Sequence, residues 1–211
     1  MKTLFTTLLL VLTLSLTAQT YSYFDNDVRF VGDEYGGSVT TLTHFGLFPI
    51  TEKFGFTDYA SIEGNNQYQY GQVLLGGYYN ITDKLSVYVM GGKESTSNQV
   101  RFGYMAYYTT GDKFRTYAFY QRNQNPFSSE TRDSDWYDVM LRVAITSKDN
   151  NSLYVGGRYM KFYGVGVPIS VRQKLNDSSN LYLGYTTFYD VDGDYGNSDW
   201  LPTITLALEF L

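Results

Sequence analysis

Apolar and polar residues alternate along most of the chain. In residues 136–146, Tyr137, Val139, Leu141, Val143 and Ile145 share one face, and the residues between them are mixed and mostly polar. A period of two predicts β-strands with one apolar face. We expect twelve strands, with ten or fourteen as alternatives. They fall at 21–31, 38–48, 53–62, 68–80, 84–92, 99–109, 113–123, 136–146, 151–162, 167–175, 180–190 and 201–211.

The segments between these strands alternate in length. Short turns that contain an acidic residue recur about every 30 residues, and longer polar segments such as "NQNPFSSETRDSDW" lie between them. Each repeat therefore holds two strands joined by a tight turn. This rhythm predicts a chain of antiparallel hairpins. The acidic turn residues are Glu52, Asp83, Asp112, Asp149 and Asp177.

The direction of the apolar face separates two fold classes. A soluble β-sandwich would point it inward, but strands near ten residues long and a strict short-long rhythm favour an outward face in lipid. A sheet in lipid must close, because its edge amides would otherwise lack partners. We predict an all-β, transmembrane, antiparallel up-and-down β-barrel. Aromatic residues near the short turns would form an interface girdle (Phe48, Phe54, Tyr79, Tyr108, Phe114), with Trp136 and Trp200 toward the opposite rim.

The first residues predict a cleaved secretory signal. Lys2 precedes the apolar run "LFTTLLLVLTLSLTA", which ends at the small residue Ala18. The run is shorter than the ~20 residues of a spanning helix. Residues 1–18 are therefore expected to be a signal peptide and 19–211 the barrel. Loss of Lys2 changes the net charge from −5 to −6, so nucleic acid is not an expected partner.

The signal, the hairpin rhythm and the terminal strand "TITLALEF" resemble Gram-negative outer-membrane β-barrels of the small channel or porin type. The resemblance implies a monomer in the bacterial outer membrane, in contact with membrane lipid and lipopolysaccharide. It also implies insertion by the barrel-assembly machinery, which in that family reads a terminal strand with an aromatic end. Here Phe210 is followed by Leu211, which departs slightly from that pattern.

A shorter segment carries a narrower resemblance. Residues 40–64, "TTLTHFGLFPITEKFGFTDYASIEG", are similar to the early hairpin of nucleoside-specific channels, in which an apolar strand ends in an acid. Asp58 would match that acid. The size of the chain and its inward arginines also resemble acidic-oligosaccharide porins.

The inward faces of five consecutive strands each carry an arginine. An arginine on the lipid face costs roughly 2 to 4 kcal/mol at the bilayer midplane, which favours inward placement. Counted from the short turns, the five lie at different heights and would form a ladder that attracts carboxylates or phosphates. Alternatively, inward Asp138, Asp190 and Glu209 neutralise them and side chains fill the lumen. The predicted solute path consists of Arg101, Arg115, Arg142, Arg158, Arg172 and Asp58.

Catalytic and metal-binding signals are weak. His44 is the only histidine, there is no cysteine, and no serine lies in a G-x-S-x-G elbow, so we predict no catalytic residue and no enzyme. The acids at 190–194 have EF-hand spacing, but Tyr195 and Leu201 replace the expected Gly and Glu, so neither a metal nor a cofactor is expected. The predicted function is a passive channel for small solutes, anionic or sugar- or nucleoside-like. The alternative is a filled barrel with a structural or surface-adhesion role.

Overall fold

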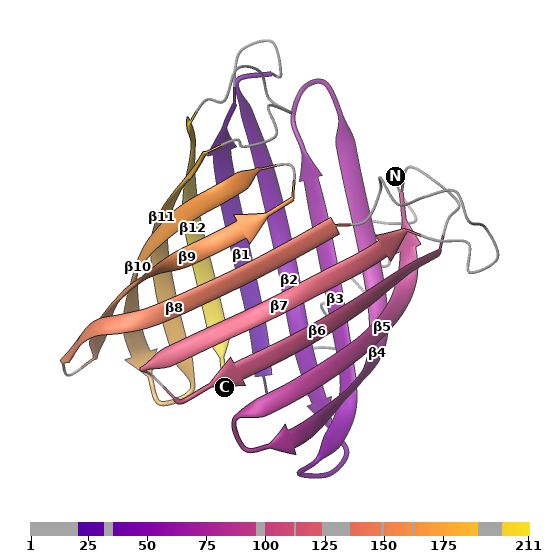
Figure 1. The fold of residues 1–211 in the computed structure, drawn as a ribbon, viewed down its shortest axis with the longest axis vertical. Coiled ribbons are helices and arrows are strands. Elements are labelled where there is room, and N and C mark those ends of the chain that lie inside the picture. Colours follow the sequence, from indigo (N-terminus) through magenta and orange to yellow (C-terminus); the bar gives the residue numbers. More distant parts are fainter. Residues whose placement is uncertain are drawn as a thin grey trace.

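The computed structural model describes residues 21–31, 36–95, 100–111, 113–123, 136–148, 150–161, 163–189 and 200–211. They form one closed antiparallel barrel in which each strand pairs with its neighbours in sequence and β1 pairs with β12 (Figure 1). The strands are β1 (Tyr21–Phe30), β2 (Ser38–Pro49), β3 (Phe54–Gly64), β4 (Gln69–Thr82), β5 (Leu85–Glu94), β6 (Val100–Thr109), β7 (Phe114–Asn123), β8 (Trp136–Lys148), β9 (Asn151–Met160), β10 (Gly164–Asn176), β11 (Ser179–Tyr189) and β12 (Trp200–Phe210).

All twelve predicted strands and the closed up-and-down topology are confirmed, which excludes ten or fourteen strands. The largest difference in bounds is in β10, which begins at Gly164 instead of residue 167. The predicted bounds left residues 163–166, "YGVG", as the turn between the two strands. In the structure, the Tyr163 N–H donates to the Met160 carbonyl at 3.0 Å and Gly164 has a φ of 82°, so the turn is tight and β10 starts earlier.

The outer surface of the barrel is apolar. Tyr137, Val139, Leu141, Val143 and Ile145 of β8 are between 39% and 62% exposed, as the alternation predicted. Large apolar side chains of comparable exposure occur on every other described strand except β7. A continuous apolar surface of this extent is typical of a face that contacts lipid.

The aromatic girdle is confirmed near the short turns. Phe54, Tyr79 and Tyr108 are 45%, 48% and 36% exposed, and Phe114 packs edge-on against Tyr108 with ring centroids 5.9 Å apart. The last strand, β12, finishes on this side of the barrel, beside the turns of the lower rim (Figure 1). Within the described ranges, no helix is long and apolar enough to cross a membrane.

Trp136 corrects part of the girdle prediction. It lies in phase with inward Asp138 on β8 and packs inside the barrel against Phe119, with ring centroids 5.5 Å apart. Trp200 is 61% exposed on the outer surface, as expected. The interior beside Trp136 is densely packed with apolar and aromatic side chains, among them Leu74, Tyr78, Tyr88, Met90 and Phe119.

Some predictions concern segments outside the described residues. These are the signal sequence at 1–18 and the acids at 190–194, including Asp190 as a partner of the arginines. Both remain predictions.

Candidate solute path through the barrel

The barrel encloses a cavity of about 1080 Å³. Its lining runs from the short-turn rim, at Lys53 and Lys84, to Tyr68 at the opposite end of the strands. Four of the five predicted arginines line it: Arg101, Arg115, Arg142 and Arg158. Most of these are engaged by other side chains, and their partners determine what each can do.

Arg172 also points inward, but it lies in the wall. It is 9% exposed, its Nη2 donates to Ser152 Oγ at 3.2 Å, and its guanidinium lies 5.9 Å from the centre of the Tyr154 ring. Its contacts therefore tie β10 to β9. It has little surface left for a solute.

Arg158 is held by a two-point ion pair. Its Nε donates to Asp138 Oδ1 at 2.9 Å and its Nη2 to Asp138 Oδ2 at 2.7 Å. Tyr117 adds a hydrogen bond to Asp138 Oδ2 at 2.8 Å, and Asp27 lies 4.0 Å from Arg158 Nη1. This geometry satisfies the charges of both Arg158 and Asp138. It agrees with the alternative prediction, in which Asp138 neutralises an inward arginine.

Arg115 bridges the lumen near the short-turn rim. From β7, its Nη1 donates to Glu209 Oε1 of β12 at 3.0 Å and to the Tyr182 hydroxyl of β11 at 3.1 Å. Glu209 Oε2 also accepts hydrogen bonds from Asn180 at 2.8 Å and Tyr182 at 2.7 Å, and Tyr21 donates to Oε1 at 3.1 Å. Because β7 does not neighbour β11 or β12, this bridge crosses the interior and narrows it.

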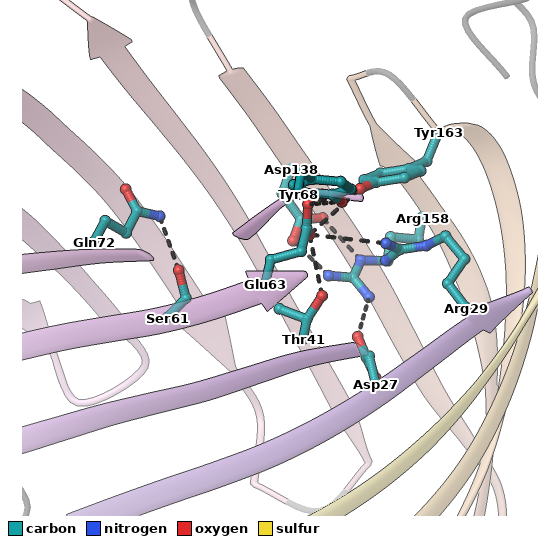
Figure 2. A network of polar contacts seen from close by, with 10 residues as sticks. All are labelled: Asp27, Arg29, Thr41, Ser61, Glu63, Tyr68, Gln72, Asp138, Arg158 and Tyr163. Atoms are coloured by element: carbon teal, nitrogen blue, oxygen red, sulfur yellow. Dashed lines mark hydrogen bonds and ion pairs between the residues drawn. The ribbon is translucent and has the colours of Figure 1, made fainter. Parts of the chain in front are cut away.

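A second polar network lies toward the opposite rim (Figure 2). Glu63 accepts hydrogen bonds from Tyr68 at 2.8 Å, Thr41 at 3.1 Å and Tyr163 at 3.3 Å. Arg29 Nη1 lies 4.0 Å from Glu63, and its guanidinium covers the Tyr163 ring at 3.6 Å. The sequence analysis did not select Arg29 or Glu63. Side chains alternate along β1, so Arg29 faces the lumen in the same phase as Asp25 and Asp27, and strand alternation alone could have found it.

Three further contacts lie toward this rim. Arg101 forms an ion pair with Glu94 on the neighbouring strand β5. Gln121 of β7 donates through Nε2 to Gln72 Oε1 of β4 at 2.6 Å. Gln72 in turn donates to Ser61 at 3.1 Å, as Figure 2 shows. The Gln121–Gln72 contact again joins strands that are not neighbours, so polar side chains cross the lumen at more than one level.

Arg142 differs from the other lining arginines. It makes no hydrogen bond or ion pair with any residue that the structure describes, although its side chain is inward and partly exposed to the cavity. In the strand register it lies directly opposite Arg115. Two like charges opposite each other on one face are unfavourable. This position therefore suits an anion that would approach Arg142 from the cavity.

The register also corrects the predicted ladder. Counting from the short turns placed Arg115 and Arg142 at different heights, but strands in a tilted barrel are staggered, so these two residues are direct cross-strand partners. Met140, two residues before Arg142, is in turn opposite Arg158. The arginines of β7, β8 and β9 form one local group instead of evenly separated rungs.

Asp58 is not in the lumen. In β3 the cavity is lined by Tyr59, Ser61 and Glu63, and Asp58 has the opposite phase. It lies on the outer face, with Oδ2 3.4 Å from Nδ1 of His44. This corrects the prediction that Asp58 lines the solute path. That prediction came from a resemblance, and the alternation of the residues beside Asp58 in β3 was not used to decide which way its side chain points.

A closed twelve-stranded barrel with an apolar outer face and a lumen lined by polar and aromatic side chains has the fold of outer-membrane porins. Solved structures with this fold include the KdgM porin (TM-score 0.54, 11% identity, 90% of this chain and 98% of that chain). The NanC porin matches with a TM-score of 0.54 and 8% identity over 89% of this chain and 99% of that chain. The TodX deltaS2S3 mutant monoaromatic hydrocarbon channel matches with a TM-score of 0.52 and 8% identity over 94% of this chain and 91% of that chain. At these identities the likeness establishes the fold.

No protein-family model matches the sequence, and no curated protein does. The similarity of residues 40–64 to nucleoside-specific channels is not shown by these comparisons. The outward position of Asp58 also removes the residue on which that similarity depended. Among the described residues, no three His, Cys, Asp or Glu side chains are grouped so that they could hold a metal ion.

Proposed function

We propose that the protein is a passive outer-membrane channel for small solutes, with a weak preference for anionic or sugar-containing ones. The observation that carries the proposal is Arg142, whose guanidinium faces a cavity of about 1080 Å³ without a bonded partner among the described residues. A guanidinium in a narrow lumen attracts carboxylates and phosphates and orients them through paired hydrogen bonds. Arg101, Arg115 and Arg158 would add to the local potential along the path.

The preference is expected to be weak because the lining is balanced in charge. Acidic and basic side chains are equally numerous among the described residues that line the cavity. Asp25 and Asp27 face it from β1, opposite in sign to the arginine group. A lumen of this kind favours anions only near Arg142, so we expect selectivity to depend on that single side chain.

The structural relatives bind different solutes. KdgM has been solved in complex with disordered oligogalacturonate, an acidic sugar polymer, whereas TodX is a monoaromatic hydrocarbon channel. An acidic sugar would fit Arg142 beside inward aromatic rings such as Tyr23, Tyr107 and Tyr117, which offer stacking surfaces. We therefore favour the acidic-sugar class. A single closed sheet has no free edge to pair with a second chain, which supports a monomer. Its apolar outer face would contact membrane lipid and lipopolysaccharide, and insertion by the barrel-assembly machinery stays a prediction.

The second candidate is a filled barrel with a structural or adhesion role. The bridges from Arg115 to Glu209 and from Gln121 to Gln72 favour it, because each crosses the interior between strands that are not neighbours. Such a barrel would carry no current.

Single-channel recording of the purified, folded protein tests both candidates. The channel predicts discrete conductance steps and a reversal potential shifted toward anions in a salt gradient. Arg142→Gln should reduce that shift. Arg122→Gln is the matched control, because Arg122 has the opposite phase to lumen-facing Gln121 and loses the same charge outside the cavity. Absence of conductance would support the filled barrel, and an unchanged reversal potential in Arg142→Gln would reject the role of Arg142.

A further inference from the structure

Three buried polar side chains lie on the apolar outer face of β1, β2 and β3. They are Ser22, His44 and Asp58, each less than 5% exposed. Their sequence neighbours Tyr21, Tyr23, Phe45 and Tyr59 line the lumen, so the three residues belong to the opposite, lipid-facing side. Ionisable residues on that side are costly and rare, and they indicate a functional site by default.

The three side chains lie in a fixed order, with a hydrogen bond between Ser22 and His44 and a longer contact, not a hydrogen bond, between His44 and Asp58. His44 Nε2 lies 3.0 Å from Ser22 Oγ, and His44 Nδ1 lies 3.4 Å from Asp58 Oδ2. With Nδ1 protonated and directed to the carboxylate, Nε2 can accept the hydroxyl proton of Ser22. A nucleophile, a base and a group that orients the base, connected through these two ring nitrogens, are the arrangement that activates a serine for acyl transfer.

The strand register explains how three separate strands build this contact. Ser22 and Asp58 are the two direct cross-strand partners of Gly46. His44 lies two residues earlier on the same strand and the same face as Gly46. Because Gly46 has no side chain, the His44 imidazole can reach Ser22 on one side and Asp58 on the other. The sequence analysis did not group these three residues, since residues 22, 44 and 58 form no recognisable motif until the strands are paired.

The site lies at the membrane level where lipid esters are found. Ser22 is the second residue of β1, at the short-turn rim, and its cross-strand partner on β12 is Phe210, which is 40% exposed. Aromatic girdles mark the level of the headgroups, with the acyl chains beginning just inside them. A carbonyl attacked by Ser22 would therefore belong to a lipid in the leaflet next to the short turns.

We propose that Ser22, His44 and Asp58 form a hydrolase site for acyl esters of membrane lipids. The Ser22 hydroxyl oxygen attacks the ester carbonyl while its proton passes to His44 Nε2. The ester bond then breaks, and the lipid alkoxide leaves with that proton, so the acyl group remains on Ser22. Water from the interface attacks the acyl group, gives its proton to Nε2, and the proton returns to the Ser22 oxygen as the fatty acid departs.

Two features set the expected rate. The Phe24 ring lies over His44, with ring centroids 4.4 Å apart, and packs against Phe210, so Phe24 must rotate for a lipid to enter. The backbone around Ser22 belongs to strand ladders on both sides, which leaves its N–H groups committed. Loss of one oxyanion donor typically lowers turnover by about 10² to 10³. We therefore expect slow hydrolysis, and the test starts with an activated probe.

The test uses the full-length barrel in phosphatidylethanolamine vesicles and an alkyl fluorophosphonate, which labels activated serines. We expect labelling of the wild-type protein, none of Ser22→Ala, and at least a tenfold lower rate for His44→Gln and Asp58→Asn, with partial recovery in Asp58→Glu. Ser170→Ala is the control, because Ser170 is a buried serine of β10, remote from the three strands of the site. Phe24→Ala should be labelled faster. Fatty acid release from the vesicles should follow the same order.

Folding is checked for every variant by the mobility shift between boiled and unboiled protein. Folded wild-type protein that resists the probe, or equal labelling of wild type and Ser22→Ala, would overturn the proposal and leave the three residues as a polar clamp between β1 and β3. Conductance does not depend on this site. A failed hydrolase therefore leaves the channel proposal intact, and a closed channel leaves the hydrolase testable.

Discussion

Arg158 and Arg142 occupy the same inner surface on neighbouring strands, yet their surroundings are opposite. Arg158 makes two hydrogen bonds to Asp138, at 2.9 and 2.7 Å, and both side chains are largely buried. Arg142 makes none within the described ranges and lies opposite Arg115. Both residues were selected by the same sequence pattern. Alternation therefore locates a charge in the lumen, and the cross-strand partners decide whether that charge supports the wall or remains available to a solute.

The difference has an energetic basis. Loss of the partner of a paired, hydrogen-bonded ion in a partly dry lumen is strongly destabilising, because the remaining charge loses its main compensation. An unpaired ion beside a like charge contributes little to the free energy of unfolding. The free energy of unfolding should therefore separate the two arginines, and the predictions below begin with the largest expected effect.

Removing the Asp138 carboxylate, the partner of Arg158, should lower the free energy of unfolding the most. Asp138→Asn leaves Arg158 without its two-point partner and weakens the Tyr117 contact. We expect the free energy of unfolding, measured by urea titration in lipid, to fall by about 3 kcal/mol, the lower end of the range for buried pairs. The double variant Asp138→Leu with Arg158→Met should recover most of the loss. Equal losses in both variants would contradict a pairing effect.

Breaking the Arg115–Glu209 bridge across the lumen should lower the free energy of unfolding by a smaller amount, and it should also change the single-channel conductance. In Arg115→Ala, Glu209 keeps its hydrogen bonds from Asn180, Tyr182 and Tyr21. We expect a loss of about 1 to 3 kcal/mol, the cost of leaving a buried charged group short of one partner. Removing the bridge should also raise single-channel conductance. A conductance equal to wild type would mean that the narrowest point lies elsewhere.

Much of the fold could be predicted because two local signals agreed throughout the chain. Alternation placed Val139 and Leu141 outside and Arg142 and Arg158 inside, and the structure confirms each of them. Turn spacing set the strand order. Trp136 was misplaced because its type suggested an interface while its phase on β8 pointed inward. Where residue type and strand phase disagree, phase is the better guide to the side of the wall.

The candidate sites were harder to predict because they depend on pairing between strands. The stagger that places Arg115 opposite Arg142 is set by the closure of the whole barrel and cannot be counted from one turn. The contact of Ser22 with His44 joins residues of β1 and β2, and Asp58 is added from β3. Three strands must be in register before these side chains meet. No window of sequence contains that information.

Neutralising Arg142 should leave stability unchanged. Arg142→Gln removes no hydrogen bond or ion pair to the described residues and relieves its repulsion with Arg115. We expect the free energy of unfolding to change by less than about 0.5 kcal/mol in either direction, as for ordinary surface substitutions. The same urea titration measures it beside Asp138→Asn. A loss comparable to that of Asp138→Asn would mean that Arg142 is structural and would end the contrast with Arg158.

The smallest effect is expected outside the membrane, in the turn between β10 and β11. Lys174 Nζ donates to Asp177 Oδ1 at 2.7 Å, and this hydrogen bond together with its charge holds the pKa of the Asp177 carboxyl below its usual value. A lowered pKa in the folded state gives stability that is present above the unfolded pKa and lost as the pH falls through the folded pKa. Because Asp177 is fully exposed, water and salt screen the pair. Asp177→Asn should therefore lower the urea midpoint only slightly at neutral pH, and this small difference from wild type should vanish in acid. A difference that grew as the pH fell would show that the linkage has the opposite sign.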